Sequence, residues 1–468
     1  MSVKSFLRGI LPSTNRNFEE KMSKLDSDLG NMISEIRDLE HRIEGLRERL
    51  DLVSSALSTL DGRAASLDEK MSYIEWRHRY CNGEYSGLLT GDGGKILLAG
   101  WYGADNFGDE LMLRTVIESF PRGSLDRIYV LLWDNPRYDR WGLNPAVHVI
   151  HYPNSIWDLE ILSDRFDAVV WGGGAILDDK QLDSNPGNIN TGNLFIRLNE
   201  LMIGKGKKVF ALGLSANDKL EDEDYIRRLS AIIDSSELFS LRDPYSLQTL
   251  VDAGVNAGQV VLCEDLAFSN QGLRALRASY APVPEKRLGV VLLCVEDQFA
   301  HNLELLRSLL ENDRLRDEGY VISLIPFLDE NGWDILHFRR LKESLPDCER
   351  VVIERCSRNI EDTPIASCSR LISYKYHAAL IADVLGIPNL SVYCNSHPHY
   401  KNKMMHLADL ADVRSSLMSS SDVDERLNVM LEALLDMRCV PNISIEMMEH
   451  ECESLKETCL AIASKEAK

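Results

Sequence analysis

Short apolar runs alternate with helical patterns through most of the chain, and this alternation constrains the possible folds most strongly. A first series lies at 95–103, 127–134, 148–153, 167–174, 207–215, 238–243 and 259–265, and a second at 288–296, 319–329, 350–354, 370–376 and 389–394. Apolar strands that alternate with helices are typical of a parallel sheet covered on both faces. The pattern therefore predicts an α/β protein with two Rossmann-like units, joined near 270–287.

The predicted domain organisation follows from these two series. A chain of 468 residues is too long for one ordinary domain. We expect an N-terminal Rossmann-like domain at 94–275, a C-terminal Rossmann-like domain at 285–410 and a helical tail at 411–468. In such a pair of domains a ligand cleft is expected between the carboxyl ends of the strands.

A heptad pattern precedes the first strand and predicts a coiled coil at 22–80, after an N-terminal segment at 1–21. Apolar residues step by alternating threes and fours from Met22 to Ile74, with charged and polar residues between them. So narrow an apolar stripe needs a partner helix, so we expect a homo-oligomer. The alternative is a long helix folded back on its own domain. The mixture of Leu, Ile and Met at the core positions leaves the number of strands open.

Charge and cysteine content restrict the class of protein. A net charge of −21 argues against nucleic-acid binding, which needs a basic surface. The ten cysteines show no C-x-x-C pair and no metal-ligand spacing, which favours a reduced, cytoplasmic protein without a metal. No signal peptide or membrane-spanning run is expected. The apolar residues within 6–11 are compatible with a peripheral contact at the inner face of the membrane. The simpler alternative is a frayed N-terminus.

Two glycine-rich turns follow predicted strands. The stretch GWYGADNFGDELM (100–112) comes directly after the run KILLA and contains the candidate residues Gly103, Asn106, Gly108 and Asp109. Such a turn usually brings backbone N–H groups and a helix N-terminus close to an anion, although Asn106 or Asp109 as a simple helix cap is the alternative. The second turn, WGGGAILDD, allows close approach of a ligand to the backbone through Gly172, Gly173 and Gly174.

Two further strand ends carry candidate charged residues. In SLRDPYSLQTL, Arg242 is placed to hold a carboxylate or phosphate, unless it pairs with Asp243 or another acid at the surface. In SYKYHAALIADVLGIP, His377 opens an apolar helix and Lys375 precedes it by two residues. A lone histidine is more often a structural residue than a catalyst, so spacing alone does not establish a role for His377.

The chain resembles the polysaccharide pyruvyl transferases in the order and separation of five blocks. These are GWYGADNFGDELM, WGGGAILDD, SLRDPYS, CEDLAF (263–268) and YHAALIADVLGIPNLSV. The resemblance extends over about 95–410 and does not include the predicted coiled coil. It implies a GT-B-like arrangement of the two domains, with phosphoenolpyruvate as donor substrate, no cofactor and no metal. The implied acceptor is a sugar or glycan of a surface polysaccharide or its precursor, with a lipid-linked form left open.

The resemblance also implies roles for individual residues. The product would be a pyruvate ketal on two sugar hydroxyls, with phosphate released. His377 suits the general acid or base, since its unperturbed pKa lies near neutrality, and Arg242 would hold the donor. Further positive charge would come from Lys375 and from Lys401 or Lys403, between which the sequence does not decide. The glycine turns would present N–H groups to the phosphate.

The chain departs from the family pattern in two places. Lys375 stands where family members often carry arginine, and LGLSANDKLED (212–222) replaces a Gly-x-Gly-Pro type of turn. Two alternatives therefore stay open. One is a GT-B glycosyltransferase that uses a nucleotide sugar, and the other is a non-catalytic coiled-coil assembly protein with a degenerate transferase domain.

Overall fold

The computed structural model describes residues 23–33, 37, 39, 43, 94–133, 143–153, 156–181, 191–217, 219–328, 332–345, 348–394, 399–412, 417–439 and 442–464. The chain divides into two compact units, Met1–Glu75 and Trp76–Lys468. In the first unit residues 23–33 are helical, and Leu25, Leu29 and Met32 are exposed in the single chain. Residues 37, 39 and 43 are also helical, and the rest of the predicted coiled coil at 22–80 lies outside the described residues, so its association is a prediction from the heptads alone.

The first sheet of the second unit has seven parallel strands in the order β3-β2-β1-β4-β5-β6-β7. The strands are β1 (Ile96–Ala99), β2 (Ile128–Leu132), β3 (His148–His151), β4 (Ala168–Leu177), β5 (Lys208–Ala216), β6 (Leu238–Leu241) and β7 (Val260–Leu262). The helices between them are α4 (Phe107–Ser119), α5 (Ile156–Arg165), α6 (Thr191–Gly204), α7 (Glu223–Ser235) and α8 (Pro244–Asp252). Every residue of β1 and β2 is buried, as the continuous apolar runs predict for a sheet covered on both faces.

The second sheet has six parallel strands in the order β10-β9-β8-β11-β12-β13. The strands are β8 (Arg287–Val291), β9 (Val321–Leu324), β10 (Val351–Ile353), β11 (Arg370–Ser373), β12 (Asn389–Tyr393) and β13 (Leu417–Ser419). Its helices are α10 (Phe299–Glu311), α11 (Asp313–Asp317), α12 (Trp333–Glu343), α13 (Tyr376–Leu385), α14 (His399–Leu410) and α15 (Val423–Asp436). The prediction of an entirely helical tail after 411 is wrong at β13, a short strand that pairs with β12 at the sheet edge.

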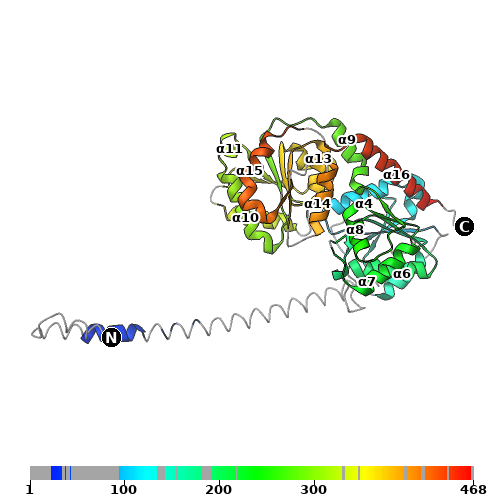
Figure 1. The fold of residues 1–468 in the computed structure, drawn as a ribbon, viewed down its shortest axis with the longest axis horizontal. Coiled ribbons are helices and arrows are strands. Elements are labelled where there is room, and N and C mark those ends of the chain that lie inside the picture. The colour runs from blue at the N-terminus through cyan, green and yellow to red at the C-terminus, as the bar shows by residue number, and fades with distance from the viewer. Residues whose placement is uncertain are drawn as a thin grey trace, which may run out of the picture. The chain divides into compact units, whose positions relative to one another are not determined.

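The C-terminal helix returns to the first sheet's side of the molecule. The chain crosses from the first sheet to the second through α9 (Gln271–Ser279), and α16 (Ile445–Ala463) packs back against α4, as Figure 1 shows. Arg127 Nη2 donates a hydrogen bond of 2.8 Å to the carbonyl oxygen of Ala463, and Cys459 of α16 is fully buried. The chain thus returns from the second sheet to pack its last helix on the first domain.

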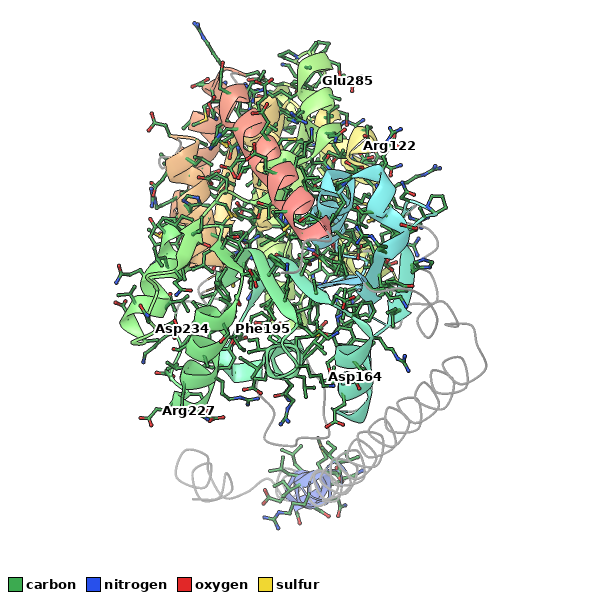
Figure 2. All side chains as sticks on the ribbon, turned by 90° about the vertical axis from the view of Figure 1, so that its right-hand side faces the viewer. Arg122, Asp164, Phe195, Arg227, Asp234 and Glu285 are labelled. Carbon is green, nitrogen blue, oxygen red and sulfur yellow. The ribbon has the colours of Figure 1, made fainter. Side chains whose placement is uncertain are left out.

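Side chains divide between surface and interior as expected for a globular α/β unit. In Figure 2 Asp164, Arg227 and Asp234 lie on the outer surface, whereas Phe195 lies within the packed layers and is completely buried. Among the described helices, none is long and apolar enough to cross a lipid bilayer.

Candidate active site

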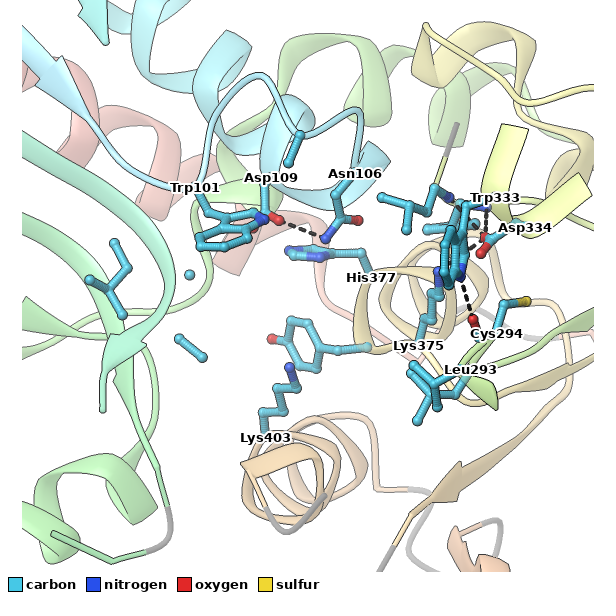
Figure 3. A pocket seen from close by; sticks show the side chains of 18 of the residues that line it. Trp101, Asn106, Asp109, Leu293, Cys294, Trp333, Asp334, Lys375, His377 and Lys403 are labelled. Atoms are coloured by element: carbon cyan, nitrogen blue, oxygen red, sulfur yellow. Dashed lines mark hydrogen bonds and ion pairs between the residues drawn. The ribbon is translucent and has the colours of Figure 1, made fainter. Parts of the chain in front are cut away.

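A pocket of about 440 Å³ lies where the carboxyl ends of the two sheets face each other (Figure 3). The first sheet contributes the end of β4 and residues that follow β1, β4, β5 and β6, and the second contributes residues that follow β8, β9, β11 and β12. The pocket is thus in the position expected for the ligand site of a doubly wound pair of sheets. Its volume is in the range of small-molecule sites.

The loop between β1 and α4 joins the two domains at the pocket. The Phe107 N–H donates to the carbonyl oxygen of Phe327 at 2.9 Å, and Asn106 forms an isolated β-bridge with Leu328. Asn106 Nδ2 donates to Asp109 Oδ2 at 2.6 Å, and both side chains line the pocket. Asn106 is the N-cap residue of α4, but its side chain makes no capping hydrogen bond. Burial raises the pKa of Asp109.

Gly103 and Gly108 make close contacts within the protein that the sequence did not predict. The Gly103 N–H donates to Glu110 Oε1 at 2.7 Å, and Gly103 does not line the pocket. Gly108 lies in the first turn of α4, where an added Cβ would be only 2.0 Å from His377 Nδ1. The glycine at 108 therefore gives the imidazole room against the helix, a relation that the sequence did not reveal.

Of the three consecutive glycines, Gly174 alone lines the pocket. The Gly172 carbonyl oxygen accepts a hydrogen bond from the Tyr102 hydroxyl, behind the pocket wall. Gly173 has φ 70°, and a Cβ there would be 2.4 Å from Met112 Sδ. Gly172 and Gly173 therefore pack closely against Tyr102 and Met112 within the first domain and do not line the pocket.

Arg242 is buried at the floor of the pocket, with 2% of its surface exposed. Its Nη1 lies 2.5 Å from Asp265 Oδ2, and the guanidinium carbon lies 5.0 Å from the centre of the Tyr376 ring. Asp243 is the N-cap of α8 and accepts a hydrogen bond from the Ser246 N–H at 2.6 Å. The alternative of a surface ion pair for Arg242 is therefore wrong, because its ion pair with Asp265 is buried.

His377 and Arg242 share Asp265. His377 Nε2 lies 3.4 Å from Asp265 Oδ1, while the other carboxylate oxygen pairs with Arg242. Burial alone would raise the pKa of Asp265, but the charges of His377 and Arg242 hold it well below its usual range. Sequence reasoning did not select Asp265 as a site residue, although the block CEDLAF that contains it was one of the five family blocks.

The three candidate lysines lie at different positions relative to the pocket. Lys375 Nζ donates to Asp334 Oδ2 at 3.1 Å, and the same carboxylate accepts the N–H groups of Phe327 and Leu328. Lys403 lines the pocket, and burial lowers its pKa to about 7. Lys401 is exposed outside the pocket, 5.8 Å from the centre of the Tyr393 ring. The structure thus brings Lys403, and not Lys401, to the site.

Two tryptophans that sequence reasoning passed over stand on opposite sides of the pocket, with His377 between them in Figure 3. Trp101, in the loop after β1, lies 5.0 Å from Trp133 between ring centres. Trp333, at the start of α12, donates from Nε1 to the Cys294 carbonyl oxygen at 2.6 Å. Within the described residues no group of three or more His, Cys, Asp or Glu side chains is placed to hold a metal ion.

Comparison with known proteins gives a family and a fold. A family model described as polysaccharide pyruvyl transferase matches residues 106–396, which is more than half of the chain. UDP-GlcNAc 2-epimerase from Neisseria meningitidis, bound to UDP-GlcNAc, is similar in structure with a TM-score of 0.50 and 12% identity, covering 78% of this chain and 99% of that one. UDP-N-acetylglucosamine 2-epimerase from Rickettsia bellii gives a TM-score of 0.50 and 10% identity, covering 79% and 96%. At these identities the likeness shows the GT-B-like fold only. Comparison with curated proteins gives no match.

Proposed function

The chain belongs to the polysaccharide pyruvyl transferase family, and we propose that it transfers pyruvate from phosphoenolpyruvate to a sugar of a surface polysaccharide or its precursor. The observation that carries this proposal is that Arg242 and His377 both line the pocket between the two sheets and both lie beside the buried carboxylate of Asp265. This group combines a buried cation with a histidine that lies beside a carboxylate. An anionic donor that must also be protonated needs both features.

The donor end of the pocket is assigned to Arg242 and Lys403. Phosphoenolpyruvate carries a carboxylate and a phosphate, so it needs at least two positive groups in a partly desolvated site. Arg242 is already paired with Asp265, which fixes its position but leaves less charge for the donor. Lys375 lines the pocket as well but is paired with Asp334. Lys403 is close enough to Arg242 to be influenced by its charge, and it gains its full charge when an anion binds beside it.

The proposed reaction assigns the proton transfers to His377. A sugar hydroxyl oxygen forms a bond to C2 of the donor while C3 gains a proton and the hydroxyl loses one. The bond between C2 and the phosphate oxygen then breaks and phosphate leaves. A second hydroxyl of the same sugar adds to C2 and gives its proton to the departing phosphate, which completes the ketal. His377 suits these transfers because imidazole in general donates and accepts protons near neutral pH, and its Nε2 lies 3.4 Å from Asp265 Oδ1.

The proposal is tested by release of inorganic phosphate from phosphoenolpyruvate with a panel of free, nucleotide-linked and lipid-linked sugars. We expect acceptor-dependent phosphate release in the native protein and none in His377→Ala. A matched control is Val429→Ala, because Val429 is exposed on α15 and does not line the pocket. Release of UDP from a UDP-sugar without phosphate release would instead indicate a GT-B glycosyltransferase. Binding of glycan without either product would indicate the non-catalytic assembly protein.

We further propose that the heptads at 22–74 assemble copies of the chain and that the protein works in the cytoplasm, at or near the inner face of the membrane. The heptads support the first statement. The chemistry of the donor, a cytoplasmic metabolite in the family's expected reaction, supports the second. A lipid-linked acceptor would explain a peripheral position.

A further inference from the structure

We propose that the acceptor binds through two adjacent sugar units, the second of which occupies a separate hollow along helix α12. This inference rests on the proposed function, because it places the rest of the acceptor beside the same pocket. The hollow has a volume of about 440 Å³ and shares Cys294 and Trp333 with the pocket described above. A sugar chain can therefore extend from one cavity into the other across Trp333.

One face of α12 builds the hollow. Trp333, Leu336, His337, Arg340 and Glu343 recur at three- and four-residue spacing and all line it. Residues at this spacing lie one above another on a helix surface. The helix thus presents an apolar start, next to the catalytic pocket, and a polar end farther along the same face.

Trp333 and Leu336 supply the apolar surface on which a sugar ring can lie. They are 53% and 52% exposed, which is unusual for two large apolar side chains one turn apart beside a pocket. The hydrogen bond from Trp333 Nε1 to the Cys294 carbonyl oxygen holds the indole in place before any ligand arrives. A pre-oriented aromatic ring loses little conformational freedom on binding. A pyranose has an apolar C–H face that matches such a surface.

The charges around the hollow favour a neutral sugar over a phosphate group. Arg340 forms two hydrogen bonds with the Glu296 carboxylate, at 2.8 and 2.9 Å, so this cation is balanced. Arg339 and Glu343 also line the hollow, so its four charged side chains comprise two arginines and two glutamates, and burial lowers the pKa of His337. A site for a diphosphate would need an excess of positive groups. The balanced set instead offers donors and acceptors to sugar hydroxyls.

The test measures binding without phosphoenolpyruvate, so that it does not depend on turnover. The full-length protein is titrated with an array of neutral methyl disaccharides and with the methyl monosaccharides of which they consist, by ligand-observed NMR. We expect at least one disaccharide to bind about tenfold more tightly than either of its monosaccharides. We expect Leu336→Ala, which changes only the hollow, to remove this preference while monosaccharide binding stays the same. Trp333→Phe should keep more of the preference than Trp333→Ala.

The control variant is Val429→Ala, which removes an exposed apolar side chain outside the hollow. It should keep the full preference for the disaccharide over its monosaccharides. Equal affinity for disaccharides and monosaccharides in the native protein, or an unchanged preference in Leu336→Ala, would overturn the proposal. Tighter binding of glucose 1-phosphate than of methyl glucoside, lost in Arg339→Ala, would also overturn it and make the hollow an anion site. Absence of phosphate release would contradict the proposed function alone, because these titrations contain no donor.

Discussion

Replacement of Gly108 by alanine should inactivate the enzyme through His377 while the fold is kept. The added Cβ would lie 2.0 Å from His377 Nδ1, whereas ordinary van der Waals contact begins near 3.4 Å. The imidazole must therefore retreat by more than about 1 Å, and its Nε2 now lies 3.4 Å from Asp265. A displacement of about 1 Å in a reacting group costs on the order of 10²-fold in rate. We expect kcat to fall by about that factor or more.

The stability of this variant separates the proposed clash from a general effect on the helix. Alanine in place of glycine in a helix contributes up to about 1 kcal/mol, whereas overpacking costs about 1–3 kcal/mol. The free energy of unfolding should therefore fall by about 0–2 kcal/mol in Gly108→Ala. If the imidazole is first removed, the clash disappears, and Gly108→Ala in the His377→Ala background should stabilise the protein by up to about 1 kcal/mol.

The assay combines steady-state phosphate release with urea unfolding of the four proteins in this double-mutant cycle. The matched control is Gly204→Ala, because Gly204 is also helical and an added Cβ there has no neighbour within 4 Å. It should keep normal turnover. Native turnover in Gly108→Ala, or the same change in unfolding free energy in both backgrounds, would refute the contact between Gly108 and His377 as the reason for the glycine.

Three further predictions follow from the pocket and the heptads. Burial lowers the pKa of Lys403 to about 7 in the free protein, and a bound anion raises this pKa. The affinity for phosphoenolpyruvate, measured by calorimetry, should therefore be highest below pH 7 and fall as the pH rises above 7. Lys403→Arg, which stays charged, should lose this dependence, and an identical pH profile in both proteins would exclude Lys403. Arg242→Ala should lower the free energy of unfolding in urea by about 3–5 kcal/mol, because it leaves Asp265 charged and buried, and Asp265→Asn in the same chain should recover part of this loss. A change below about 1 kcal/mol would contradict a structural role for the pair. Removal of residues 1–83 should reduce the number of subunits seen by light scattering, and an unchanged number would place assembly in another part of the chain.

Local patterns were sufficient to predict most strands and the position of the cleft. Continuous apolar runs identify buried parallel strands because both faces of such a sheet are covered, and the run at 95–103 indeed contains β1. Parallel strands also direct their carboxyl ends to one edge, so the loops after β1, β6 and β11 were expected to meet. The strand β13 was missed because its three residues, LMS, are too few to show a period of two.

The sequence alone therefore determined the order of the strands and helices, the family blocks and the loops that carry charged residues. Tertiary structure decided which of those residues face the pocket. Lys401 and Lys403 are two positions apart on α14, and side chains at that spacing point to different sides of a helix, so Lys403 lines the pocket and Lys401 does not. The pairing of Asp265 with both Arg242 and His377 joins three segments far apart in the chain. Such contacts depend on how separate elements pack, so they cannot be predicted from a local sequence pattern.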